Sequence, residues 1–300
     1  MSDLIIGGSP AWLNQPPMPL AFVATICSSD VIELQKAAEW LEIRDWQNER
    51  EHSNTREYRR VCPPAEAWEC FQGFRSAFFF MDALLQPESE RNHKLLICDM
   101  DMTMVDSETL DDVAALAGIG DQIAEITRRA MHGEIDFDGA LRERIRMLQG
   151  QPIEWFERIG REVALNPGAE ELINTCRGRG IHTILISGGF EQVVEQVASR
   201  LGFDEFYCNH LQVEEGLLNG VVFDPIVDAE FKRTLLQTRA QALGLPMSQC
   251  CAIGDGANDR LMIEAAGLGI AFHAKPILRS ATCAQINYGG LDRAARYLGL

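Results

Sequence analysis

An apolar run that ends in two carboxylates constrains the fold of this chain more than any other feature. Residues 95–98 are Leu-Leu-Ile-Cys, and Asp99 and Asp101 follow with one residue between them. Such a run indicates a strand buried on both faces, as in a parallel sheet covered by helices. In open α/β sheets the chemistry gathers at the carboxyl ends of strands. Buried carboxylates there need a cation, and Mg²⁺ would suit them because it prefers oxygen ligands.

Two further apolar runs end in polar residues and glycine. Residues 184–186 precede Ser187 and Gly188, and residues 251–253 precede a Gly-Asp-Gly-Ala-Asn-Asp segment that contains Asp255. Strands alternate here with helical patterns, which indicates a parallel sheet with right-handed crossovers. The Asp-x-Asp pattern alone also occurs in solvated loops. The joint occurrence of three such strand ends favours a shared site.

Together these motifs resemble the haloacid dehalogenase superfamily of phosphoryl-transfer enzymes. That superfamily combines a nucleophilic aspartate, a Ser or Thr, a lysine and a Gly-Asp-x-x-x-Asp motif, in that order. The corresponding residues here are Asp99, Ser187, Lys232, Asp255 and Asp259. The resemblance implies an α/β core whose parallel sheet lies between two helical layers, with a helical cap inserted after the first catalytic strand.

A second set of segments is similar to the phosphoserine phosphatase family within that superfamily. These segments are Glu108 and residues 128–133, 136–137, 141–144 and 274–276. The resemblance implies hydrolysis of O-phospho-L-serine to L-serine and phosphate through an aspartyl phosphate, the last step of L-serine biosynthesis. One residue departs from the family pattern: Met102 stands where a Ser is common, and a Met cannot donate a hydrogen bond to phosphate. The rate or the polar contacts could differ, but the intact Asp99, Asp101 and Thr103 favour retained activity.

The resemblance assigns the acidic residues to catalysis and metal binding. Asp99 would be the nucleophile, and Asp101 would act first as general acid toward the serine oxygen and then as the base that activates water. Mg²⁺ would bind the Asp99 and Asp255 carboxylates and the Asp101 backbone carbonyl. Thr103 and Asp259 would support this site. Capping of the following helix is an equally good interpretation of Asp259.

Four residues are predicted to surround the phosphoryl group. Ser187 and the Gly188 amide precede a helix N-terminus, which offers free N–H groups to an anion; a tight connection is the alternative. Lys232 would balance the phosphoryl and aspartate charges. Most helical lysines are solvated, but the helical wheel places Lys232 beside apolar residues on the inward arc. For Asn258, contact with the phosphate region is implied by the resemblance.

A helical wheel over residues 137–149 predicts an inward-facing arginine. Arg144 shares the apolar face of this segment, whereas Arg142 and Arg146 point to solvent. An inward arginine needs an anionic partner, and its planar fork suits a carboxylate. The resemblance assigns Arg144 to the substrate α-carboxylate. An ion pair with an acidic residue of the cap, such as Glu108, is the alternative.

The same resemblance completes the substrate pocket. Glu108 would hold the substrate ammonium group, and Phe137 and Met131 would shape the pocket. A simpler interpretation of Glu108 is the preference for acids in the first turn of a helix. Two rival functions stay open. One is transfer of the phosphoryl group to another alcohol such as homoserine, and the other is a phospho-accepting signalling module, against which Asp101 and the cap argue.

A polar, Pro-containing segment at residues 86–94 predicts the main boundary of the chain. Residues 1–90 would form a small α+β domain, with an ACT-like, amino-acid-sensing role or a structural or dimerising role as equally good interpretations. We expect strands there at 21–26, 57–61 and 77–85 and helices at 31–41 and 65–74. Residues 91–300 would form the phosphatase domain, with a helical cap at about 107–166. We expect further strands at 182–187, 250–255 and 268–272 and a hairpin at 211–222.

Charge and cysteine usage narrow the range of partners. The net charge of −17 argues against a general nucleic-acid or anionic-membrane surface. Nine cysteines occur without a Cys-x-x-Cys pair, which suggests reduced thiols in a cytosol. We expect neither a secretory signal nor a membrane span, because no basic residue precedes Lys36 and no apolar run is long enough. These features predict a cytoplasmic enzyme with a small-molecule substrate, and a homodimer is an open option.

Overall fold

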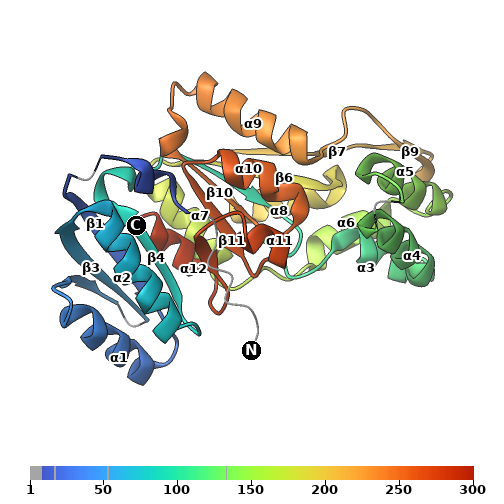
Figure 1. Cartoon of the computed structure of the whole chain (residues 1–300). Helices are drawn as coiled ribbons and strands as arrows, with labels where there is room; N and C mark the ends of the chain where they lie inside the picture. Colours follow the sequence, from blue (N-terminus) through green and yellow to red (C-terminus); the bar gives the residue numbers. More distant parts are fainter. Residues whose placement is uncertain (1–8, 17, 53, 133) are drawn as a thin grey trace.

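The centre of the molecule is a six-stranded parallel sheet (Figure 1). The computed structural model describes residues 9–16, 18–52, 54–132 and 134–300. The strand order is β12-β11-β10-β5-β6-β7. These strands are β5 (Leu95–Asp99), β6 (His182–Phe190), β7 (Glu205–Asn209), β10 (Cys250–Gly254), β11 (Leu268–Phe272) and β12 (Ala284–Ile286). The central strands are apolar and buried because helices cover both faces of the sheet.

Two helical layers enclose this sheet. One layer holds α7 (Ala169–Gly178), α8 (Glu191–Leu201) and α12 (Asp292–Tyr297), and the other holds α9 (Ala229–Ala242), α10 (Arg260–Ala265) and α11 (Pro276–Arg279). Alternate side chains of β5 pack against the two helical layers. Leu96 and Cys98 pack with the first layer, and Leu95 and Ile97 pack with the second. The predicted three-layer α/β/α core is confirmed.

A helical insert follows β5 before the chain returns to the sheet through α7. Its helices are α3 (Thr109–Leu116), α4 (Gly120–Met131), α5 (Phe137–Met147) and α6 (Glu154–Glu162). The hairpin of β8 (Leu211–Glu214) and β9 (Leu217–Val222) packs on this insert, where the N–H of Gly150 donates to the Leu218 carbonyl at 2.8 Å. The hairpin therefore extends the predicted helical cap.

One prediction about α5 holds only in part, because the Arg142 side chain is 31% exposed but also bonds to the chain around the β8–β9 hairpin. The helical wheel directs Arg142 to solvent, but its guanidinium donates to the Val222 carbonyl at 3.0 Å and pairs with Asp224 at 2.5 Å. The wheel treats the helix as isolated, whereas the β8–β9 hairpin covers this side of α5. Arg146, one turn further along, is exposed as predicted.

The chain before β5 forms a smaller α+β unit, called the N-terminal unit below. It consists of β1 (Leu20–Cys27), α1 (Val31–Glu42), β2 (Gln47–Glu51), β3 (Thr55–Cys62), α2 (Pro64–Ala77) and β4 (Asp82–Pro87). The antiparallel order β2-β3-β1-β4 is that of a βαββαβ unit. The strand predicted at 77–85 begins only at Asp82, because α2 extends to Ala77. The edge strand β2 was not predicted, because all its side chains are polar and exposed.

The N-terminal unit and the helical insert lie on opposite sides of the core (Figure 1). Largely separate apolar clusters fill the N-terminal unit and the core. The domain boundary at residue 90 and the ACT-like character of the unit stay predictions. All nine cysteines are free thiols. Within the described ranges, no helix has both the length and the apolar character to cross a membrane.

Candidate active site

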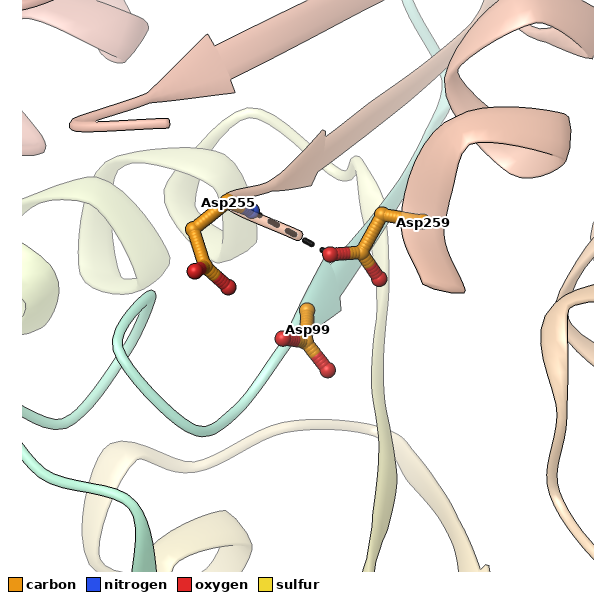
Figure 2. Close-up of side chains that lie close together, drawn as sticks. All are labelled: Asp99, Asp255 and Asp259. Atoms are coloured by element: carbon orange, nitrogen blue, oxygen red, sulfur yellow. Dashed lines mark hydrogen bonds between the residues drawn. The ribbon is translucent and has the colours of Figure 1, made fainter. Parts of the chain in front are cut away.

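The carboxyl ends of β5 and β10 bring three predicted acidic residues together. The two strands end level, because Cys98 lies opposite Ile253 in the parallel ladder. Carboxylate oxygens of Asp99, Asp255 and Asp259 lie within 4.8 Å of one another (Figure 2). All three side chains are buried, so this is a cluster of negative charge with little access to water.

Lys232 is the cation inside this cluster. Its side chain is 0% exposed, and its Nζ lies 2.5 Å from Asp99 Oδ1 and 2.7 Å from Asp259 Oδ1. The burial predicted from the helical wheel is therefore confirmed. Asp228 caps the N-terminus of α9 by accepting the Phe231 N–H at 2.8 Å, which fixes the first turn from which Lys232 projects. Burial would lower the pKa of Lys232, but Asp259 and Asp99 outweigh it and raise the pKa, so the lysine stays charged.

Asp259 uses both carboxylate oxygens within the protein. Oδ1 accepts from Lys232, and Oδ2 accepts the N–H groups of Asp255 at 3.2 Å and Gly256 at 3.0 Å. Figure 2 shows the bond from the Asp255 amide. A Cβ at Gly254 would lie 2.4 Å from Asp259 Cγ, so only glycine fits there. Asp259 thus orders the turn after β10 and contacts Lys232, whereas its side chain makes no capping hydrogen bond to the following helix α10.

The cluster carries more negative charge than Lys232 balances. Burial and Asp259 raise the pKa of Asp99 well above its ordinary value, and the same causes raise the pKa of Asp255 to about 7. A bound cation would remove this penalty. The atoms available to bind a metal are carboxylate oxygens, so the three aspartates are a candidate site for a hard divalent metal ion. The Asp101 carbonyl accepts no hydrogen bond from the described residues, and its role as a metal ligand stays a prediction.

Asp101 lies beside this cluster in a separate set of hydrogen bonds. Its Oδ1 accepts the Thr109 N–H at 3.0 Å, and its Oδ2 accepts the Ser187 hydroxyl at 3.1 Å. Ser187 Oγ in turn accepts the Gly189 N–H at 2.8 Å. Burial raises the pKa of Asp101 although these hydrogen bonds oppose the shift. A carboxyl group with a raised pKa can hold a proton closer to neutral pH.

Arg144 reaches the site from the helical insert. Its only hydrogen bond among the described residues is a long one of 3.4 Å from Nε to the Ala140 carbonyl. The alternative of an ion pair with Glu108 is not observed, since no carboxylate of the described chain lies within ion-pair distance of Arg144. Burial lowers the pKa of Arg144, while the fields of Asp111, Glu108 and Asp101 oppose the change. Within the described ranges the guanidinium of Arg144 thus interacts electrostatically with three acidic residues but forms an ion pair with none of them.

Phe137 brings the helical insert into contact with the core. Its ring lies over the last residues of β6, with Cζ 3.4 Å from the position of a Cβ at Gly188. The side chain is 37% exposed, so part of the ring faces open space. The side chain of Met131 lies outside the described part of the structure.

Lys275 is a residue at this site that sequence reasoning did not assign. Its N–H donates to the Asp255 carbonyl at 2.9 Å, and its Nζ lies 3.6 Å from Glu108 and 3.7 Å from Asp255. Glu108 is the N-cap residue of α3 but makes no capping hydrogen bond with its side chain. It therefore faces the site rather than its own helix. The Ala-Lys-Pro segment that contains Lys275 was the only signal in the sequence.

Three other residues named in the sequence analysis lie in the loops that follow β5 and β10. Thr103 is fully buried, and its Oγ1 has no hydrogen-bond partner within the described chain. Asn258 is half-buried in the short turn η4 (Ala257–Asp259). Met102 has a φ of 55° and exposes 39% of its side chain, so it faces away from the packed core. The loop between β5 and α3 thus exposes Met102 and buries Thr103.

Comparison with known proteins decides the family. The haloacid dehalogenase-like hydrolases match residues 96–264, more than half of the chain. The chain belongs to this hydrolase family. The match begins in β5 and ends in α10, so it spans the acidic cluster and the helical insert of this hydrolase but not its N-terminal unit.

Phosphoserine phosphatases are among the similar members of the hydrolase family. The enzyme of Streptococcus thermophilus is 45% identical over 204 residues, which cover 68% of this chain and 95% of that protein. The one of Archaeoglobus fulgidus is 40% identical over 222 residues, 73% of this chain but only 64% of the relative's length. A solved structure of a phospho-aspartyl intermediate analogue of phosphoserine phosphatase is 36% identical with a TM-score of 0.64, covering 69% of this chain and 99% of that one.

Proposed function

We propose that this hydrolase converts O-phospho-L-serine to L-serine and phosphate, the last step of L-serine biosynthesis. One observation carries the proposal: the buried Asp99–Lys232 contact occurs together with an arginine, Arg144, that interacts electrostatically with Asp101 but has no carboxylate partner among the described residues. The first feature suits phosphoryl transfer, and the second suits a substrate that carries a carboxylate. Similarity to the phosphoserine phosphatases of two organisms supports the same substrate.

Asp99 would be the nucleophile, held and partly neutralised by Lys232. In the first step an Asp99 oxygen bonds to phosphorus, the bond between phosphorus and the serine oxygen breaks, and Asp101 gives its proton to that oxygen. In the second step the Asp101 carboxylate takes a proton from water, the water oxygen bonds to phosphorus, and the Asp99–phosphorus linkage breaks. The raised pKa of Asp101 supports this assignment, because the group must carry a proton when the first step begins.

We propose Mg²⁺ for the metal site because its available donors are oxygens. The carboxylates of Asp99 and Asp255 and the backbone carbonyl of Asp101 would hold the ion. When bound, it would supply positive charge to the phosphoryl oxygens. Asp259, whose oxygens are already used, would position Lys232 and the turn after β10, and Thr103 would support the loop after β5.

The substrate would lie between the core and the helical insert. Ser187, Gly188, Lys232 and Asn258 would surround its phosphoryl group. The Arg144 fork would bind the α-carboxylate, and Glu108 would bind the ammonium group at the position where Lys275 now approaches it. Phe137 and Met131 would form the wall over the carbon atoms.

Removal of the Arg144 guanidinium tests this arrangement. Arg144→Ala should lower kcat/KM for O-phospho-L-serine by roughly 10- to 150-fold, because a hydrogen bond to a charged group contributes about 1.5–3 kcal/mol. Phosphoethanolamine lacks the carboxylate, so it should be a poor substrate of the wild type and change little in the variant. Phosphate release in Mg²⁺ measures both rates, and the exposed Arg146→Ala is the matched control. Equal losses for both substrates would mean that Arg144 supports the cap instead.

The same assay separates hydrolysis from transfer. If phosphate release from O-phospho-L-serine is unchanged when homoserine or another alcohol is added, water is the acceptor. A cytoplasmic location and a homodimer formed through the N-terminal unit complete the proposal. Light scattering of the purified chain measures its mass in solution and tests the dimer.

A further inference from the structure

The ladder between β6 and β7 is interrupted at the phosphate-binding turn proposed above. The strands pair regularly from Ile184 to Ile186, and pairing resumes only where Phe190 lies opposite Asn209. Over this interval β6 advances four residues while β7 advances two, from Tyr207 to Asn209. Residues 187–189 therefore leave the ladder as a bulge. Bulges re-aim backbone and side-chain groups near active sites, but they also leave backbone groups without ladder partners.

The side chain of Asn209 takes up one of these groups. It is 0% exposed, and its Nδ2 donates to the Gly188 carbonyl at 2.8 Å. The hydrogen bond from Asn209 fixes the orientation of the peptide plane that contains the Gly188 carbonyl. Residues 187–189 are therefore held in the bulge and do not pair with β7. The Ser187 hydroxyl is thus kept on the side of Asp101, with Oγ 3.1 Å from Oδ2, and the Gly189 N–H donates to it at 2.8 Å.

The other end of the same carboxamide reaches the helix of Lys232. Asn209 Oδ1 accepts the Val227 N–H at 2.8 Å, and Val227 directly precedes Asp228, the N-cap of α9. Lys232 follows one turn later with Nζ at 2.5 Å from Asp99. A single buried side chain therefore joins the turn at Gly188 to the start of the helix that carries the central cation. A carboxamide suits this place because its NH₂ group donates while its oxygen accepts.

We propose that Asn209 is a positioning residue that sets the spacing between the Gly188 turn and Lys232, the two walls of the phosphate site. The inference rests on the proposed phosphatase function, but its readout is phosphate binding and not substrate choice. Asn209 touches no reacting atom. Its loss should displace the anion-binding groups while the carboxylates of Asp99 and Asp255, which lie on β5 and at the end of β10, keep their places.

Two variants of the full chain test the proposal. Asn209→Asp keeps the acceptor for Val227 but places a carboxylate oxygen against the Gly188 carbonyl, and Asn209→Ser removes both bonds with a smaller side chain. Either should raise the inhibition constant for inorganic phosphate and lower kcat/KM by about 10- to 100-fold, the cost of misplacing binding groups by about 1 Å. If the Asp variant does not fold, the Ser variant alone decides.

Gln86→Leu is the matched control. Gln86 is another buried carboxamide that donates to a backbone carbonyl, that of Tyr297 at 2.6 Å, and it lies in β4 of the N-terminal unit. Its loss should lower the melting temperature by an amount similar to the loss of Asn209 and leave phosphate inhibition unchanged. Equal melting losses with phosphate inhibition and kcat/KM within about twofold of wild type in the Asn209 variants would overturn the proposal.

The assay also separates this inference from the proposed substrate. Inhibition by phosphate can be measured with an aryl phosphate, which needs neither Arg144 nor Glu108. If O-phospho-L-serine is not turned over but the aryl phosphate is, the proposed function fails. An unchanged inhibition constant for phosphate in the Asn209 variants with the aryl substrate overturns the positioning role, and a raised one supports it.

Discussion

Two buried groups of carboxylates and cations differ in charge balance: one lies beyond the end of the edge strand β12, and the other lies at the ends of β5 and β10. Asp82, the first residue of β4, is fully buried and accepts N–H groups from Asn287 at 2.6 Å and Gly289 at 2.9 Å. It also pairs with the buried guanidinium of Arg293. One carboxylate thus meets one cation and several amides. In the active-site cluster, by contrast, Lys232 contacts two of three carboxylates, those of Asp99 and Asp259, and Asp255 has only the exposed Lys275 at 3.7 Å.

The difference in balance separates a structural contact from a functional one. Each charge removed from water costs several kcal/mol unless partners within the protein replace the lost hydration. For Asp82 the replacement is complete, and the contact joins the N-terminal unit to the segment 287–293 of the core. At Asp99 and Asp255 the partners within the protein replace the lost hydration only in part. A divalent cation could supply the missing positive charge. An unbalanced buried cluster is therefore the better indicator of a site.

The largest effect should follow a change at Asp99. Asp99→Asn should lower phosphate release by about 10⁴-fold or more, because a covalent route has no substitute for its nucleophile. Thermal stability without divalent cations should be unchanged or higher, since the change removes one of three crowded negative charges. Steady-state assays and thermal melts measure the two outcomes. Asp106→Asn, an exposed aspartate in the same loop, is the control, and near-wild-type turnover of Asp99→Asn would refute the covalent mechanism.

The opposite behaviour is expected at Asp82. Asp82→Asn should lower the free energy of unfolding by about 3–5 kcal/mol, because it leaves the Arg293 guanidinium buried without its anion. The specific activity of the folded protein should stay near the wild-type value. Urea denaturation with parallel assays below the transition measures both, and Glu49→Gln on the exposed strand β2 is the control. Loss of activity at full folding would show that the N-terminal unit also controls the site.

The sequence predicts the centre of this molecule well because burial there leaves a local signature. β5, β6, β10 and β11 are apolar runs that helices cover on both faces, and their polar ends mark the site directly. The missed strands lack that signature. β2 is polar along its length, β7 is only partly buried in its first three residues, and β12 has only three residues.

Contacts between distant segments set the limit of such predictions. The wheel of α5 cannot show that the hairpin 211–222 covers Arg142, and nothing near Lys275 shows that its ammonium approaches Glu108. Asn209 likewise has no local signal, because its two partners are 21 and 18 residues away. Spacing reveals which residues carry the chemistry, and only the folded chain reveals which residues hold them in place.

A third prediction uses the cation itself. Mg²⁺ should raise the free energy of unfolding of the wild type by about 2.7 kcal/mol at 100 times its dissociation constant, since it binds the folded state. Asp255→Asn should lose most of this gain, because a carboxylate donor is removed. Asp82→Asn should show the full gain from a lower starting point. Melts at increasing Mg²⁺ measure the effect, and an equal gain in Asp255→Asn would place the cation elsewhere.

The smallest effect is a pH dependence of the metal-free protein. Burial and Asp259 raise the pKa of Asp255 from 3.8 to about 7, so between these values the folded state holds a proton that the unfolded state has lost. Stability should therefore fall as pH rises through this window, by at most about 1.4 kcal/mol per pH unit for one carboxyl group. Asp82→Asn should keep this slope, whereas Asp255→Asn should reduce it.

Urea denaturation in EDTA between pH 5.5 and about 8 measures this slope, where the folded protein releases the proton near the raised pKa. The difference between the wild type and Asp255→Asn isolates one carboxyl group from its neighbours, including Asp99, whose pKa is also raised. Saturating Mg²⁺ should flatten the profile of the wild type, because a bound cation favours the ionised carboxylate and removes the proton from the folded state. Parallel profiles for the two proteins in EDTA would mean that Asp255 is already ionised at pH 5.5. The active-site cluster would then be as well balanced as the contact between Asp82 and Arg293.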